Sequence, residues 1–422
     1  MVFALTLFIA LFCATLLLML GSGLLGSLVG LRLSLAGVST AVIGQIMAGF
    51  YLGLIIGSFL CPRIVRRAGH IRAFAAFAAV NTATALLYPL FVAPGMWFVF
   101  RVMSGLSMMG LYMVVESWLA DRTEPHMRGQ VFSVYMAMTF LGLGFGQLFL
   151  HTRNLGGSDL FLVAGIFFSL CLVPVTLTRS IHPSLPETST FDLRDLFRRA
   201  PLGLLGALST GAVASAFFSL APVFVLESGL DVSTVAWFMG VTIFCGLLLQ
   251  WPVGLLSDRL DRRLVMAVLN LLVALASVTI ILAAGRSIAL LFLATACYGG
   301  LAFTLYPVAV AHTNDRVQNH EIIPASTALI LFYGLGACLG PVAAAIAMGR
   351  FGPAGLYLFL AACTGVFGTG ALVHRRLEKP RPEQPVPYIP VPRTSAVIST
   401  IHPYSEEAEG SDKEQVPSDS QQ

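Results

Sequence analysis

Two charged residues in one long apolar stretch are the side chains of this sequence most able to do chemistry. Arg101 lies several residues into the stretch, and Glu116 lies close to its far end. An ionised side chain at the centre of a lipid bilayer costs at least about 2.5 kcal/mol unless it finds a partner or water. Charges at such positions are therefore typical of a pathway for an ion or a polar solute.

Arg101 shares one face of its predicted helix with small, apolar and aromatic residues. At about 100° per residue, one stripe contains Arg101, Gly105, Met108 and Tyr112, and we expect this stripe to face the interior of a helix bundle. In this interpretation Arg101 contacts an anionic group of a solute or influences a proton site. In the alternative interpretation, its long side chain reaches the membrane surface instead.

Glu116 is too far from Arg101 for the two to pair, since the helix between them spans roughly 22 Å. We consider two roles. In the first, Glu116 is a latch that pairs with loop arginines when the protein is closed on that side; these are Arg66, Arg67 and Arg72. In the second, it carries a proton, because it is a carboxylate within an apolar segment. The latch is favoured, because buried carboxylates also serve structural networks.

Uncharged polar residues within the apolar segments are the next candidates. Hydrogen bonds between helices, worth about 0.6 kcal/mol each, are the ordinary explanation for Asn81, Gln250 and Asn270. We expect Gln45 and Gln147 to line a solute cavity in addition.

Several kinds of site are not predicted. The cysteines are single and scattered, with no CxxC pair and no Cys/His ligand spacing, so we expect neither a metal site nor a disulfide. A GxxxxGK[ST] segment is absent, which argues against ATP as the energy source. Motifs of hydrolases and zinc proteases are also absent, so the sequence predicts no enzyme activity and no cofactor.

The composition indicates which elements hold these side chains. The chain has 422 residues, of which 57% are hydrophobic and 11% charged, whereas soluble domains carry about 25% charged residues. The formal charge of +4 is too small to indicate nucleic-acid binding. About 20 apolar residues cross a bilayer as a helix. Twelve segments qualify, with approximate limits Phe3–Val29, Ala41–Leu60, Ala73–Ala93, Met96–Ala120, Gly129–Leu150, Asp159–Thr178, Leu202–Leu226, Thr234–Leu256, Leu264–Ala284, Ile288–Ala311, Ile323–Met348 and Ala354–Val373.

The predicted fold class is therefore an all-α membrane protein with twelve transmembrane helices. Arginines gather in alternate loops, including those that hold Arg66, Arg122, Arg198 and Arg262. Because basic loops stay in the cytoplasm, both the N-terminus and the C-terminus are predicted to be cytoplasmic.

The two halves of the chain resemble each other. Val38-Ser39-Thr40 corresponds to Val232-Ser233-Thr234, and Gly142-Leu-Gly144 corresponds to Gly334-Leu-Gly336. Parallel repeats of six helices are a signature of transporters. We expect a six-helix bundle over 1–178, a cytoplasmic linker over 179–201, a second six-helix bundle over 202–373 and a disordered cytoplasmic tail over 374–422. Within the linker, residues 190–199 are predicted to form a short amphipathic helix at the membrane interface.

Loop and helix motifs carry a resemblance to a known family. The segment from Gly254 to Arg263 resembles the loop signature Gly-x-x-x-Asp-Arg-x-Gly-Arg-Arg of the major facilitator superfamily, with Asp261 in place of the second glycine. The Arg101-Val-Met-Ser-Gly105 segment is similar to the family's Arg-x-x-x-Gly motif. The stretch from Glu116 to Tyr135 is most similar to the uncharacterised YcaD-type bacterial branch. We expect this loop to supply the second part of the gating latch, formed by Gly254, Asp258, Arg259 and Arg262.

These observations predict a secondary active transporter that moves a small solute across the bacterial inner membrane by alternating access. Proton-coupled symport is the first expectation for the energy source. A proton-driven exporter of the same superfamily and a non-transporting membrane sensor or scaffold are the alternatives. The expected partners are a small-molecule solute, a proton and the lipid bilayer, with no nucleic acid, and the expected functional unit is a monomer.

Overall fold

The computed structural model describes residues 2–124, 127–177, 193–318 and 321–377, and every regular element in these ranges is helical. Twelve helical spans in the described residues are long and apolar enough to cross a membrane, which confirms the predicted fold class. Most of the predicted linker and nearly all of the predicted tail lie outside the described residues. The first half contains α1 (Val2–Leu35), α2 (Thr40–Ala68), α3 (His70–Leu87), α4 (Pro94–Arg122), α5 (Arg128–Leu148), η2 (Phe149–His151), α6 (Asp159–Leu170) and α7 (Leu172–Thr176). The second part contains α8 (Leu193–Arg199), α9 (Pro201–Glu227), α10 (Val232–Arg259), α11 (Arg262–Ala283), α12 (Ile288–Ala302), α13 (Leu305–Asn314), α14 (Ile322–Phe351) and α15 (Gly355–Leu377).

Two of the spans are broken near a proline. The break between α6 and α7 lies just before Pro174, and the break between α12 and α13 lies just before Pro307. Proline lacks a backbone N–H, and its ring clashes with the carbonyl four residues earlier, so a helix bends or breaks there.

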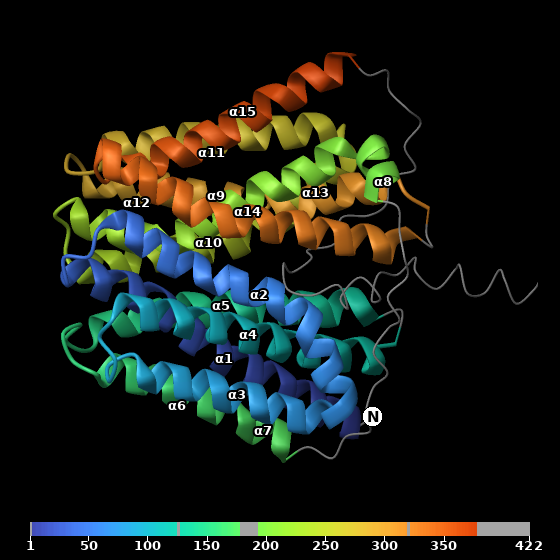
Figure 1. Ribbon diagram of the computed structural model, residues 1–422. Helices are drawn as coiled ribbons and strands as arrows, with labels where there is room; N and C mark the ends of the chain where they lie inside the picture. The colour runs from blue at the N-terminus through green and yellow to red at the C-terminus, as the bar shows by residue number, and fades with distance from the viewer. Residues whose placement is uncertain (1, 125–126, 178–192, 319–320, 378–422) are drawn as a thin grey trace, which may run out of the picture.

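The helices pack as two bundles with the same internal order. In the first, α1 packs against α5, α2 against α4 and α3 against α6. The corresponding spans of the second bundle pair in the same way, as α9 with α14, α10 with α12 and α11 with α15. Figure 1 shows the two bundles side by side, the first below the second. The parallel repeat is thus present in the packing as well as in the sequence.

The bundles touch at one end and separate toward the other (Figure 1). At the touching end the Ser34 hydroxyl on α1 donates to Glu227 on α9 over 3.5 Å, and the rings of Phe145 and Phe244 lie 5.1 Å apart. The N-terminus, α8 and the end of α15 all lie at the separated end. The arginine-rich loops lie at this end, so the distribution of basic residues predicts that it faces the cytoplasm.

Helix α8 does not lie alone at the membrane surface. Its Leu196 is fully buried against residues of α9, α13 and α14. Arg199 donates from both terminal nitrogens to the two carboxylate oxygens of Glu321, each over 2.8 Å. The hydrogen bonds to Glu321 raise the pKa of Arg199. The short helix predicted within residues 190–199 therefore exists over Leu193–Arg199, but it docks onto the second bundle.

The α2–α4 contact is the closest of those that shape the first bundle. A Cβ atom added at Gly105 would lie 1.9 Å from the carbonyl oxygen of Phe50, and one added at Gly53 would lie 2.1 Å from that of Val102. Such close backbone approach is typical of small residues at helix contacts in membranes. Gly105 was predicted to belong to the solute pathway, but its observed role is to bring α2 against α4.

We expect Gly105→Ala to lower the melting temperature of the purified protein by several degrees. The added methyl group overpacks a backbone contact, which typically costs about 1–3 kcal/mol. Gly370→Ala is the matched control, because a Cβ atom there meets nothing within 4 Å. Alanine at that helical position should be neutral or stabilising by about 0.5–1 kcal/mol. Equal melting temperatures for the two variants in a detergent unfolding assay would contradict this account of the contact.

Candidate functional site

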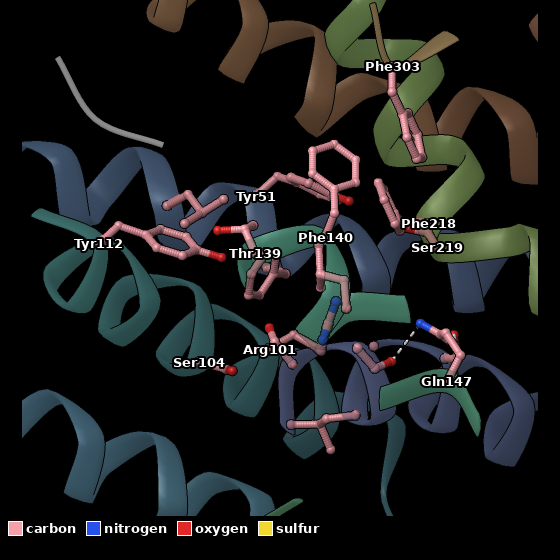
Figure 2. Close-up of a pocket in the computed structure, with 18 of the residues that line it drawn as sticks. Tyr51, Arg101, Ser104, Tyr112, Thr139, Phe140, Gln147, Phe218, Ser219 and Phe303 are labelled. Atoms are coloured by element: carbon pink, nitrogen blue, oxygen red, sulfur yellow. Dashed lines mark hydrogen bonds between the residues drawn. The ribbon is translucent and has the colours of Figure 1, made fainter. Parts of the chain in front are cut away.

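A cavity of about 200 Å³ lies between the two bundles (Figure 2). Helices of both bundles line it, so its shape depends on how the bundles sit against each other. Its walls combine eight aromatic rings, several small hydroxyl-bearing residues and one charged side chain. The lining residues are Ser22, Gly23, Leu25, Gly26, Ser27, Phe50, Tyr51, Leu54, Arg101, Ser104, Tyr112, Met136, Thr139, Phe140, Leu143, Gln147, Phe168, Phe218, Ser219, Gln250, Phe303, Pro307 and Tyr333.

Arg101 is the charged residue of this lining. Its side chain extends from α4 toward Phe140 (Figure 2), and the residue is only 5% exposed. The guanidinium carbon lies over the ring of Phe50, 4.7 Å from the ring centroid, which is a cation–π contact. Its Nε atom is buried and has no hydrogen-bond partner among the described residues. The side chain therefore lies in the cavity wall and does not reach the membrane surface.

The residues next to Arg101 on α4 are occupied by contacts between helices. The Ser104 hydroxyl donates to Oδ1 of Asn81 over 2.7 Å, and the Asn81 amide faces the sulfur of Met108 at 3.5 Å. Tyr112 lines the cavity one turn before Glu116, and its hydroxyl lies 3.8 Å from the sulfur of Met19 on α1. The predicted stripe on α4 thus faces the bundle interior, with Arg101 and Tyr112 in the cavity.

The two predicted glutamines have different positions. Gln147 lines the cavity, but its amide nitrogen donates to the Gly23 carbonyl over 2.9 Å and its oxygen accepts from Ser27 over 2.6 Å. Its amide therefore joins α1 to α5. Gln45 is an exposed residue of α2 and is not part of the lining. Gln45 and Gly105 were thus wrongly predicted to lie in the pathway. The polarity or size of a residue does not determine whether its side of the helix faces the cavity.

Sequence reasoning missed most of the second bundle's contribution to the cavity. Phe218 and Ser219 on α9, Phe303 between α12 and α13, and Tyr333 on α14 all line it. They are neutral residues in apolar helices, and no charge or periodicity distinguishes them from residues that face lipid. Two signals were available: Pro307, which follows the break in the tenth span next to Phe303, and the polar Gln250 of α10, which also lines the cavity.

Glu116 lies outside the cavity lining, near the cytoplasmic end of α4. It is completely buried, and the Tyr135 hydroxyl on α5 donates to its Oε1 over 3.0 Å. The loop arginines of its predicted latch are exposed and form no ion pair with another described residue: Arg66, Arg67 and Arg72. The Glu116 latch is therefore not formed with these three arginines in this conformation, in which the bundles touch at the end opposite the arginine-rich loops.

The second-half loop does contain paired charges. Arg262 donates to Asp258 over 2.9 Å and to Asp315 over 3.0 Å. The side chains of Arg262 and Asp315 are only 3% and 2% exposed. Gly254 is buried in α10, whereas Arg259 is exposed. Of the predicted latch residues, Asp258 and Arg262 thus join the ends of α10 and α11 to that of α13 within the second bundle, and Asp315 is a partner that the sequence did not reveal.

Asp261 explains the departure from the expected loop pattern. In the first-half loop Gly69 has φ +82°, a conformation that favours glycine. Asp261 has φ −55°, and its carboxylate caps α11 by accepting from the Arg263 N–H over 2.9 Å. Burial alone would raise the pKa of Asp261, but hydrogen bonds from Arg375 and Arg263 outweigh it and hold this pKa below its ordinary value.

The sequence profile of the Major Facilitator Superfamily matches residues 11–246 and 225–403. The two matches together cover almost the whole described chain. The chain belongs to the major facilitator superfamily. As a superfamily member it is a multi-pass membrane transporter of a small solute, and not an enzyme.

Relatives and solved structures agree with this assignment. The protein named "Uncharacterized MFS-type transporter YcaD" of Salmonella typhimurium is 27% identical over 361 residues, covering 85% of this chain and 93% of the relative. The nucleoside transporter NupG has a similar structure, with a TM-score of 0.73 at 12% identity, covering 88% of this chain and 99% of that protein. A D-xylose-proton symporter matches with a TM-score of 0.68 at 14% identity, covering 88% and 97%. At such identities the two structures show the fold that this superfamily member shares.

We expect Arg262→Gln and Asp315→Asn each to destabilise the folded protein strongly. Removing one partner of a buried ion pair leaves the other charge uncompensated, at a cost of about 3–5 kcal/mol. Arg259→Gln is the matched control, because Arg259 is exposed in the same loop. Thermal unfolding of the three purified variants checks the ranking. If Arg262→Gln and Arg259→Gln have the same melting temperature, the buried network does not hold these helix ends together.

Proposed function

We propose that this protein is a secondary active transporter of the bacterial inner membrane that carries a small solute by alternating access. The observation that carries the proposal is the position of the cavity. It lies between the two bundles, and residues of both bundles line it. Rocking of one bundle against the other therefore changes which side of the membrane the cavity faces. Its bacterial relatives support the inner membrane as its location.

The contacts at the periplasmic end are of a kind that can open. Gly44 of α2 packs against Ala345 and the Pro341 carbonyl of α14, with no strong polar bond between them. The Ser34–Glu227 hydrogen bond is long, at 3.5 Å, and exposed to solvent. An exposed hydrogen bond adds little to the free energy of this interface, because water replaces it readily. Separation of the periplasmic ends therefore breaks no buried ion pair among these contacts.

Proton-coupled symport is the energy source that we propose. Glu116 is a fully buried carboxyl group, and its hydrogen bond from Tyr135 joins α4 to α5. Protonation removes a buried charge at the cytoplasmic end of the first bundle and changes what α4 and α5 can contact. A single group of this kind suffices to link proton binding to the equilibrium between two conformations.

The first test follows the accessibility of the cavity. In a background with the native cysteines replaced, Thr139→Cys places a thiol in the cavity wall. A membrane-impermeant thiol reagent is then added from either side of oriented vesicles. We expect labelling from both sides, because the two conformations interconvert. Cross-linking Ser34→Cys to Glu227→Cys should abolish labelling from the periplasm and leave labelling from the cytoplasm, because it holds the periplasmic ends together.

The cysteine-replaced background without Thr139→Cys is the control for labelling elsewhere. A one-sided pattern that the cross-link does not change would contradict alternating access and favour the non-transporting sensor or scaffold. A two-sided pattern that persists after complete cross-linking would also contradict it.

The second test concerns Glu116. We expect the ratio of cytoplasmic to periplasmic labelling of Thr139→Cys to change with pH, and Glu116→Gln to make the ratio independent of pH. Glutamine mimics the protonated carboxyl group, so the variant is held in one state of charge. Asp121→Asn is the matched control, because Asp121 is an exposed carboxylate at the end of the same helix. If Glu116→Gln keeps the pH dependence of the unmodified protein, Glu116 is not the coupling residue.

A further inference from the structure

The charge of the cavity restricts what can bind in it. Arg101 is the one residue of the described lining that is charged at neutral pH. This lining contains no aspartate, glutamate, lysine or histidine. A buried cation is costly unless an anion or strong acceptors surround it. Because the cavity wall supplies no carboxylate, the molecule that enters the cavity is the natural source of the negative charge.

The geometry of Arg101 leaves room for such a partner. The guanidinium carbon lies over the Phe50 ring, 4.7 Å from its centroid. Carboxylates bind to guanidinium groups along the edge, through parallel N–H···O bonds. The buried Nε atom on that edge has no hydrogen-bond partner among the described residues. The contact with Phe50 helps to hold the guanidinium in place. Because Arg101 lines the cavity, and only its Nε is among the buried atoms without a partner, its terminal N–H groups are the part that an entering anion can reach.

The remaining walls fit an apolar body. The cavity's aromatic rings come from both bundles and include Phe140, Phe218 and Phe303, of which Phe218 and Phe303 are stacked with centroids 5.5 Å apart. Aromatic walls bury planar apolar groups well. The cavity's volume of about 200 Å³ lies below the range of about 300–1,000 Å³ found for drug-sized ligands, so the solute is compact.

Several polar groups of the wall already have partners. The Ser104 hydroxyl bonds to Asn81, the Thr139 hydroxyl bonds to the Tyr135 carbonyl, and the Gln147 amide bonds to α1. These three groups therefore offer a polyhydroxylated solute little replacement for its bonds to water, and each unsatisfied group costs about 1–3 kcal/mol. A cationic solute would meet the like charge of Arg101. Both classes are therefore disfavoured.

We propose that the solute is a small organic anion, a carboxylate with a compact apolar or aromatic body, whose carboxylate binds the edge of Arg101 while the body lies among the aromatic rings. This proposal rests on the proposed transport function for its physiological meaning. Binding itself, however, is measurable without transport.

The test uses three probes of nearly the same shape and different charge, namely benzoate, benzamide and benzamidine. Calorimetry and thermal stability of the purified full-length protein report binding. Phenylacetate and hexanoate, each compared with its amide, extend the series to other bodies. We expect at least one of the three carboxylates to bind about tenfold or more tightly than its amide, the effect of one charge-assisted hydrogen bond. Benzamidine should not bind.

Variants at Arg101 assign the preference to this residue. Arg101→Gln should remove the preference for the carboxylate. Arg101→Lys should keep part of this preference, because lysine retains the positive charge but lacks the forked N–H groups of arginine. If Arg101→Gln does not fold, Arg101→Lys and the charge series on the unmodified protein still decide the question. The proposal is overturned if no carboxylate binds more tightly than its amide, or if a folded Arg101→Gln variant keeps the preference.

The outcome is separable from that of the accessibility test. Two-sided labelling of Thr139→Cys without carboxylate binding leaves the transporter in place and rejects the organic anion. Carboxylate binding with one-sided labelling supports the anion site and rejects alternating access.

Discussion

The absence of water in the bilayer is the constraint on which the rest of this structure depends. Every polar group within the spans must find its partner inside the protein. Gln147, Asn81 and Ser104 do so through bonds between helices. The buried Arg262 does so through two carboxylates. Arg101 differs from them, since its described surroundings supply a ring and no carboxylate. Among the charged side chains named above, Arg101 is thus the one whose cost is left partly uncompensated, and it lies in the cavity wall.

Close helix contact then determines where Arg101 lies. Gly53 and Gly105 let the backbones of α2 and α4 touch, and this contact sets Phe50 of α2 beneath the guanidinium of α4. A glycine that binds no solute thereby fixes the position of the charged group that lines the cavity. Loss of this contact would move the guanidinium of Arg101 without changing its charge. In this bundle, residues that pack the helices therefore also determine the position of the charged group in the cavity.

The sequence predicted the fold more completely than the site. Twelve spans followed from the length and apolarity of the segments, because a bilayer demands both. Arg101 followed from its charge, since an ionised group in an apolar segment is rare without a reason. Gln45 and Tyr333 show where this reasoning ends. Gln45 lies outside the cavity, and Tyr333 lines it. Which of them faces the cavity depends on how each helix is rotated about its own axis. In two almost uniformly apolar helices, no sequence pattern indicates this rotation. Asp315 was missed for a related reason, because its partner Arg262 is distant in the sequence.

The two duplicated loops reach different physical solutions, and the difference bears on how the bundles move. The second-bundle loop is fixed by buried and capped charges: Arg262 with Asp258 and Asp315, and Asp261 with α11 and Arg375. Helix α8 adds the Arg199–Glu321 pair to the same bundle. In the first-bundle loop, Gly69 supplies a turn at positive φ, and Arg66, Arg67 and Arg72 remain exposed without an ion pair to a described residue. A loop held by a buried ion pair and by further half-buried pairs is costly to rearrange, whereas exposed arginines can change partners at small cost. The adaptable charges therefore belong to the first bundle, on the same side of the membrane as the buried Glu116.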